Sequence, residues 1–166
     1  MALSEFDLID RYFKTPAKLN GSTRLGIGDD CALLSPPLGY ELALTTDTMV
    51  EQVHFLAGTD PEALGHKLLA VNLSDLASMG AEPAAVMLAL TLPTVDADWL
   101  QAFARGFLTL ARQYGVDLIG GDTTRGPLTL SVQALGLVPV NQAMRRSAAR
   151  VGDIIGMTGQ LGDAGL

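Results

Sequence analysis

The fold of this chain is decided by residues 60–92, DPEALGHKLLAVNLSDLASMGAEPAAVMLALTL. Asp60 followed by a proline is typical of a helix start, because Asp caps free backbone N–H groups and proline is tolerated in the first turn. Gly80 is a typical helix end. The apolar run from Ala84 to Leu92 predicts a strand buried on both faces. A helix followed at once by a buried strand predicts a fold that mixes the two elements.

The neighbouring segments extend this pattern in both directions. A helix is predicted from about Asp96 to Tyr114, because large apolar residues recur there on one stripe and Gly115 closes it. Further strands are predicted at residues 31–34, 41–46, 117–119, 128–138 and 153–158, and a short first helix with Ser4 and Asp7 as a capping box. We therefore expect an α+β fold: a mixed, mostly antiparallel sheet with helices packed on one face.

Composition excludes several classes of function. The 166 residues are 48% hydrophobic and carry a net charge of −7 without a basic face, so nucleic acid is not expected as a partner. One cysteine, Cys31, excludes an internal disulfide and a cysteine-based zinc cluster. The sequence has no signal-peptide pattern and no apolar stretch long enough to span a bilayer, so we expect a cytoplasmic protein without a membrane partner.

Four segments share one design, in which an apolar element delivers an aspartate at a turn. They are GIGDD (26–30), TTDT (45–48), NLSD (72–75) and GGDTT (120–124). Carboxylates and hydroxyls are the oxygen ligands that Mg²⁺ prefers, and glycines let the backbone approach phosphate oxygens closely. Each segment alone is typical of a surface turn. Together they indicate a phosphoryl-transfer enzyme.

Asp75 is the strongest single candidate. It lies in an otherwise apolar helix, where Asn72, Asp75 and Ser78 share one face at three-residue spacing. Taken locally, His54 and Arg146 are typical of ordinary surface residues. The sequence contains neither a GxxxxGK[ST] phosphate loop nor the protein-kinase signature set, so ATP would be held by scattered carboxylates and glycine-rich turns.

Taken together, these segments resemble thiamine-monophosphate kinase, a family of the aminoimidazole-ribonucleotide-synthetase-like superfamily. The stretches that carry the resemblance are GIGDDCALL (26–34), TTDTMVEQVHF (45–55), residues 67–93, LIGGDTTRGPL (118–128) and residues 146–166. The element NLSDLASMGAEP alone marks only the superfamily. The combination with GIGDDCALL, TTDTMVEQVHF and GGDTTRG is specific to the thiamine enzyme.

The resemblance implies an ATP-dependent kinase that phosphorylates thiamine monophosphate to thiamine diphosphate. It implies several Mg²⁺ ions as cofactors, ATP as co-substrate, and direct in-line transfer without a protein nucleophile. By carry-over the magnesium ligands are Asp30, Thr45, Thr46, Asp47, Asp75 and Asp122, the ATP contacts are Gly121, Asp122 and Arg146, and the thiamine monophosphate contact is His54. Gln52 departs from the pattern, because the family usually has glycine there.

The resemblance also implies a homodimer in which the sheets of two N-terminal domains join into a barrel. We expect residues 1–150 to form the ATP- and magnesium-binding dimerisation domain, and residues 151–166 to begin a truncated C-terminal domain. On that expectation the chain folds but has little kinase activity alone. The alternatives are another ATP-dependent synthetase of the superfamily, of selenophosphate or purine type, and a non-catalytic nucleotide-binding or dimerisation module.

Overall fold

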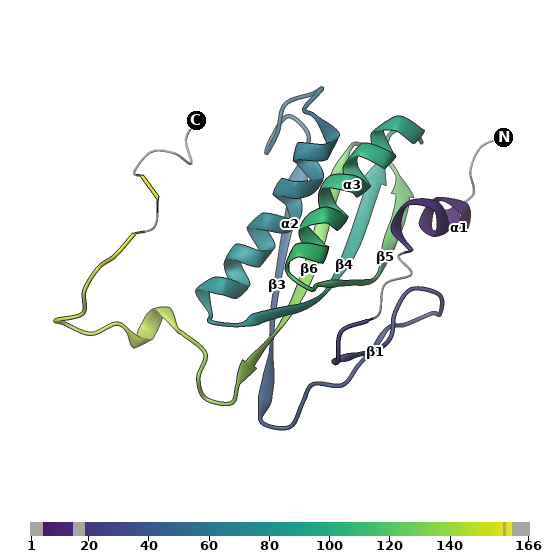
Figure 1. The fold of residues 1–166 in the computed structure, drawn as a ribbon. Helices are drawn as coiled ribbons and strands as arrows, with labels where there is room; N and C mark the ends of the chain where they lie inside the picture. Colours follow the sequence, from purple (N-terminus) through teal and green to yellow (C-terminus); the bar gives the residue numbers. More distant parts are fainter. Residues whose placement is uncertain (1–4, 15–18, 158, 161–166) are drawn as a thin grey trace.

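The computed structural model describes residues 5–14, 19–157 and 159–160, which form two layers. Two long helices lie side by side across one face of a four-stranded sheet (Figure 1). The helical elements are α1 (Glu5–Leu8), the π-helical turn η1 (Ile9–Phe13), α2 (Pro61–Ser78), α3 (Ala97–Gln113) and the 3₁₀ turn η2 (Arg146–Ala148). The strands are β1 (Thr23–Leu25), β2 (Leu33–Leu34), β3 (Tyr40–Val50), β4 (Glu82–Leu92), β5 (Asp117–Arg125) and β6 (Thr129–Pro139).

The larger sheet has the strand order β3-β6-β4-β5. Strand β6 pairs antiparallel with both β3 and β4, whereas β4 and β5 are parallel. Parallel neighbours need a long crossover, and α3 supplies it. Strands β1 and β2 form a separate two-stranded sheet. The prediction of an α+β fold, with a mostly antiparallel sheet and helices on one face, is confirmed.

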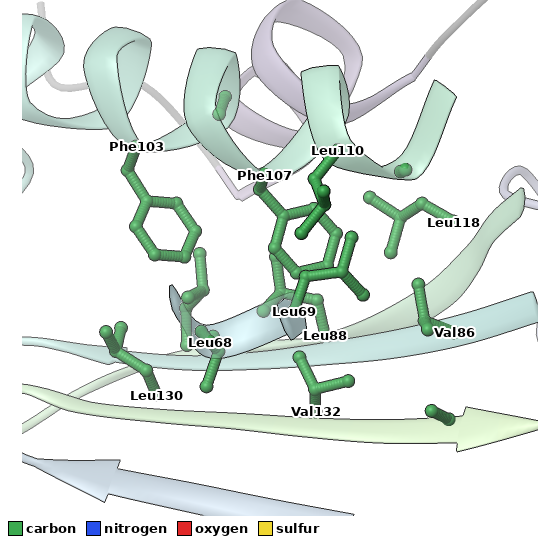
Figure 2. Close-up of a cluster of buried hydrophobic side chains, with 14 of the residues drawn as sticks. Leu68, Leu69, Val86, Leu88, Phe103, Phe107, Leu110, Leu118, Leu130 and Val132 are labelled. Atoms are coloured by element: carbon green, nitrogen blue, oxygen red, sulfur yellow. The ribbon is translucent and has the colours of Figure 1, made fainter. Parts of the chain in front are cut away.

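The core lies between the helices and the sheet (Figure 2). Phe103 and Phe107 of α3 point down onto the strands, and both are fully buried. Alternate residues of β4 and β6 point up to meet them, because successive side chains of a strand face opposite sides. This alternation divides the sheet into a helix-covered face and an open face. The open face carries Leu42, Leu44, Thr46, Thr48, Met87, Ala89, Ser131 and Gln133.

The two long helices touch through their backbones at a glycine crossing, formed by Gly65 and Gly106. A Cβ atom on Gly106 would lie 2.0 Å from the carbonyl oxygen of Glu62, and one on Gly65 would lie 2.3 Å from that of Phe103. Beside the crossing, Arg105 forms an ion pair with Glu62 at 2.6 Å. The hydrogen bond from Arg105 holds the pKa of the Glu62 carboxyl below its ordinary value.

The predicted helix ends are confirmed in their chemistry. The Asp60 carboxylate accepts the Ala63 N–H at 2.8 Å, and the Asp96 carboxylate accepts the N–H groups of the first turn of α3. Gly80 and Gly115 follow the two helices with φ of 68° and 64°, the left-handed conformation that favours glycine. Among the described residues, the helices are too short or too polar to cross a membrane.

Three strand predictions were wrong. The segment 117–119 does not end at the glycines, because β5 continues through GGDTT to Arg125 as a partner of β4. Residues 153–157 form no strand, and Thr158 lies outside the described residues. Strand β4 is not buried on both faces, since Met87 is 36% exposed on the open face. The capping-box residue Ser4 also lies outside the described residues, and the domain boundary at residue 150 stays a prediction.

Candidate functional site

The contact that brings predicted site residues together lies between α2 and β3. Thr45 Oγ1 donates a hydrogen bond to Asp75 Oδ2 at 2.7 Å. Thr45 is on the helix-covered face of β3, because it pairs with the buried Ala134 of β6. Asp75 lies in the last turns of α2 and is exposed to solvent. The pair therefore sits where the helix passes over the edge strand, within reach of a ligand.

Two more oxygen-bearing side chains lie on the same two elements, β3 and α2. Asp47 lies two residues further along β3, is half-buried, and faces the helices like Thr45. Asn72 lies almost one helical turn before Asp75 and is fully buried. We call Thr45, Asp47, Asn72 and Asp75 the α2–β3 seam. The three-residue spacing of Asn72 and Asp75 signals their shared face in the sequence, but the complete burial of Asn72 is visible only in the structure.

The seam fits a hard divalent cation. All its free ligand atoms are oxygens, and Mg²⁺ is commonly bound through one or two carboxylates, with waters and substrate phosphates completing its shell. No three His, Cys, Asp or Glu side chains of the described segments are grouped closely enough to hold a metal by themselves. The seam would therefore contribute Asp47 and Asp75, and the ligand phosphates would contribute much of the rest.

Asp122 lies away from the seam. Asp47 is level with Val132, Leu88 and Gly121 across the sheet, so three strand spacings, about 14 Å, separate the β3 and β5 edges. Asp122 pairs with Ala89 on the open face and is exposed. Thr46 is also on the open face, where its hydroxyl donates to the Val132 carbonyl at 3.0 Å. The six predicted metal ligands thus lie in three places. The seam holds Thr45, Asp47 and Asp75, the open face holds Thr46 and Asp122, and the turn between β1 and β2 holds Asp30.

Gly121 is required by the backbone of β5. Its φ is 152°, and a Cβ atom there would lie 1.8 Å from the Leu88 carbonyl oxygen. A Cβ atom on the neighbouring Gly120 would have no other atom within 4 Å. A side chain at Gly121, just before Asp122, would therefore point into the backbone of β4.

The remaining predicted residues lie on surface segments. Asp30 is exposed in the turn between β1 and β2, where its N–H donates to Asp29 Oδ1 at 2.8 Å. Arg146 is exposed in η2, beyond the end of β6. The structure does not bring either residue to the α2–β3 seam. Asp30 and Arg146 are each carried by a segment outside the four-stranded sheet.

His54 is held by the turn that follows β3. Its Nδ1 accepts the Val50 N–H at 3.0 Å, so the other ring nitrogen, Nε2, carries the proton of the neutral imidazole. Lys67 Nζ donates to the His54 carbonyl oxygen at 3.4 Å, a support with no signal in the sequence. Gln52 has φ of 63°, the conformation that glycine favours. Replacing the usual glycine by Gln52 therefore leaves the turn in a glycine-like conformation.

One hollow of the described surface is separate from the predicted site. It measures about 260 Å³ and lies near the C-terminal end of α3. Leu108 and Arg112 of α3, Ile27 and the first residues of β5 line it. None of the predicted metal, ATP or thiamine ligands lies in that lining. The seam and the open face of the sheet are the surfaces that carry the predicted chemistry.

Comparison with known proteins gives a consistent result. The family described as AIR synthase related protein, N-terminal domain, matches residues 28–138. The thiamine-monophosphate kinase of Haemophilus influenzae is 52% identical over 164 residues, which cover 99% of this chain and 50% of that protein. The chain thus spans about half the length of the curated relatives it matches.

Solved structures agree in fold. The crystal structure of thiamine-monophosphate kinase from Stenotrophomonas maltophilia has a TM-score of 0.75 and 51% identity, and the match covers 88% of this chain and 46% of that one. The structure of AaThiL complexed with AMPPCP and TMP has a TM-score of 0.60 and 30% identity, over 63% of this chain and 35% of that one. The second of these proteins was therefore seen with an ATP analogue and TMP together.

Proposed function

The chain belongs to the family described as AIR synthase related protein, N-terminal domain, and on that premise we propose that it serves in the phosphorylation of thiamine monophosphate by ATP. The observation that carries the proposal is the Thr45–Asp75 pair at the α2–β3 seam, in a chain about half identical to thiamine-monophosphate kinases. The names of these relatives favour this reading over a selenophosphate or purine-type synthetase.

The chemistry of the seam suits this reaction. Phosphoryl transfer depends on positioning and charge neutralisation more than on a protein nucleophile. Mg²⁺ would supply the positive charge that a chain of net charge −7 lacks and would polarise the phosphate oxygens. Asp47 and Asp75 would hold the cation, and Thr45 would orient the Asp75 carboxylate through its hydrogen bond before the cation binds. The acceptor phosphate of thiamine monophosphate would attack the ATP γ-phosphorus directly, in line with the leaving ADP.

The other predicted residues would act from their own segments. His54 presents an Nε2–H donor to solvent, which suits an acceptor atom on thiamine monophosphate. Gly121, Asp122 and Arg146 would contact ATP. Asp30, Thr46 and Asp122 would complete further magnesium shells once the substrates and the rest of the catalytic assembly are in place. These roles rest on the resemblance and are part of the proposal.

We also propose that the chain forms a homodimer through the open face of its sheet. No described helix covers that face, and it carries large apolar side chains, among them Leu44 at 70% and Leu42 at 39% exposure. Two such sheets facing each other would bury these side chains and form a barrel. Thr46 and Asp122 lie on the same face, so pairing would place a second sheet opposite them. The oligomeric state in solution, measured by light scattering, tests this part.

Asp75→Asn is the variant that tests the proposed function. The change keeps the size of the side chain but removes the charge that would hold the cation. We expect calorimetric binding of ATP with Mg²⁺ to weaken at least tenfold, and thiamine diphosphate formation by the full-length kinase to fall with it.

Asp98→Asn, an exposed acid at the start of α3, is the matched control and should change neither measurement. A chain that binds neither ATP nor thiamine monophosphate would instead favour a non-catalytic dimerisation module. A normal rate with Asp75→Asn would contradict the role of the seam.

A further inference from the structure

Asn72 has a buried polar atom that the fold does not satisfy. The side chain is fully buried, and its Nδ2 donates to the Leu68 carbonyl at 2.9 Å. Its Oδ1 is buried and has no hydrogen-bond partner among the described residues. The amide orientation is fixed, because the reverse orientation would place Oδ1 against the Leu68 carbonyl oxygen. The chain therefore holds a carbonyl acceptor in its interior that awaits a donor.

Folding alone gives no reason for this residue. The buried residues around it on α2 are leucines, among them Leu68, Leu69 and Leu76. A leucine has the same branched shape and the same number of side-chain heavy atoms as asparagine, and it carries no acceptor to leave unsatisfied. Buried polar groups without a partner are uncommon and costly in native proteins. The unpaired acceptor of Asn72 therefore points to a role outside the packing of the helix.

The position of Asn72 points to the cation site. It precedes Asp75 by three residues on the same side of α2, a spacing that brings two side chains together. Asp75 accepts the Thr45 hydroxyl from β3. The Thr45 hydroxyl has one hydrogen, so it can donate to one acceptor at a time. In this structure that acceptor is Asp75, and the unpaired acceptor lies beside it on the helix.

We propose that Asn72 is a positioning residue for the cation site, an inference that rests on the proposed function. When a divalent cation draws the Asp75 carboxylate into its shell, Thr45 is released from Asp75 Oδ2, and a shift of its side chain brings the hydroxyl to Asn72 Oδ1, which it does not contact in this structure. The exchange moves no proton between residues; it redirects one hydrogen bond. The Thr45 oxygen keeps its lone pairs for the cation, and the buried acceptor gains its partner only in the occupied state.

This exchange of hydrogen-bond partners predicts that replacing Asn72 lowers the affinity for the cation without lowering the stability of the fold. Removing Oδ1 takes an unsatisfied acceptor out of the unoccupied chain, so the folded state does not lose stability. It also removes the hydrogen bond that forms on cation binding, so affinity falls. A residue with only a structural role would lower stability and leave the affinity of the folded chain unchanged.

The test uses this chain with Mn²⁺ as a spectroscopic probe for the divalent site. Asn72→Leu should bind Mn²⁺ about tenfold more weakly by electron paramagnetic resonance titration, since a tenfold change corresponds to ~1.4 kcal/mol, the size of one hydrogen bond. Its urea midpoint should equal or exceed that of the unsubstituted chain. Thr45→Val should weaken binding at least as much, because it also removes an oxygen that can face the cation. The double variant should bind no more weakly than Thr45→Val alone, because both substitutions remove the same hydrogen bond.

Two further variants keep the result decisive. Asn72→Ala removes the acceptor without adding bulk. If the leucine disturbs folding, Asn72→Ala takes its place in the comparison of the single and double variants. Asn72→Asp keeps an acceptor oxygen and should retain most of the affinity. Unchanged Mn²⁺ affinity in both Asn72→Leu and Asn72→Ala would overturn the inference. So would a double variant whose loss of Mn²⁺ affinity equals the product of the two single-variant losses, because the two side chains would then act independently.

The Asp75→Asn variant separates this inference from the proposed function. If Asp75→Asn loses Mn²⁺ binding while Asn72→Leu keeps it, the cation site stands and only the role of Asn72 falls. If the unsubstituted chain binds no Mn²⁺, the cation site at the seam and the role of Asn72 both fall.

Discussion

Helix α2 makes two contacts of opposite character, one with α3 and one with β3. At the glycine crossing with α3, backbone meets backbone and there is no room for a single methyl group. At the α2–β3 seam, the same helix carries a hydrogen-bonded carboxylate and a buried amide with an unsatisfied oxygen. The close crossing lies in the first half of α2 and fixes the helix in position, so its second half can hold polar groups in a defined place. Stability and the proposed chemistry are thus divided between two halves of one helix.

The largest effect is expected at the crossing, from Gly106→Ala. The added Cβ would lie 2.0 Å from the Glu62 carbonyl oxygen, and neither helix can give way without disturbing the core. We expect a loss of about 3 kcal/mol in the free energy of unfolding, measured by urea titration. Gly21→Ala is the control, because nothing lies within 4 Å of its Cβ position. A stable Gly106→Ala variant would mean that the crossing does not fix α2.

The sequence predicts helix α2 and its ends well, but it does not predict the contacts of α2 with α3 and β3. Asp60, Gly80 and the apolar run that follows mark the helix and its strand, because capping and burial are local in sequence. The backbone contact of Gly65 with Gly106 joins residues far apart in sequence, and glycine in a helix gives no local sign of it. The Thr45–Asp75 bond likewise depends on how α2 is laid over β3.

The second largest effect is expected from Gly121→Ala at the far edge of the sheet. Both the φ of 152° and the 1.8 Å approach to the Leu88 oxygen oppose a side chain there. We expect a loss of about 2 kcal/mol, less than at the crossing because β5 is an edge strand and can move outward. Gly120→Ala, one residue earlier with open space around it, is the matched control. Equal losses for the two variants would show that general strand propensity, and not the close approach, sets the effect.

Strand β5 also explains why the site prediction is incomplete. The glycines of GGDTT are typical of a turn, yet the parallel partner β4 holds this segment in the sheet. Pairing with a distant strand overrides the local preference of glycine. Strand alternation then places Asp122 on the open face, opposite to Asp47. The sequence identifies these acidic residues as a group, but only the register of the strands tells which face each one occupies.

A smaller effect, of opposite sign, is expected in the turn after β3 from Gln52→Gly. Gln52 holds a left-handed φ of 63°, which costs a residue with a side chain about 1 kcal/mol more than glycine. Because glycine also loses more conformational entropy on folding, we expect a net gain below about 1 kcal/mol in unfolding free energy. The imidazole nitrogen shifts of His54 should stay unchanged by NMR, since the Val50 bond to Nδ1 remains. A loss of stability would mean that the Gln52 side chain contributes contacts of its own.

The smallest effect is expected from the ion pair that flanks the crossing, tested with Glu62→Gln. The Arg105 hydrogen bond lowers the pKa of Glu62 below its ordinary value of 4.5, so the folded state favours the ionised carboxyl. The stabilisation is therefore present above that value and is lost as pH falls through the lowered pKa of the folded state. Both side chains are about half exposed, so salt screens the pair.

The melting temperatures of the unsubstituted chain and of Glu62→Gln should differ slightly at pH 7 and low salt, and converge in 1 M salt or well below pH 4.5. A difference that widens on acidification would contradict this sign. A large, salt-independent difference would show that the hydrogen bonds between Arg105 and Glu62, and not the screened charge attraction, help to hold α2 against α3.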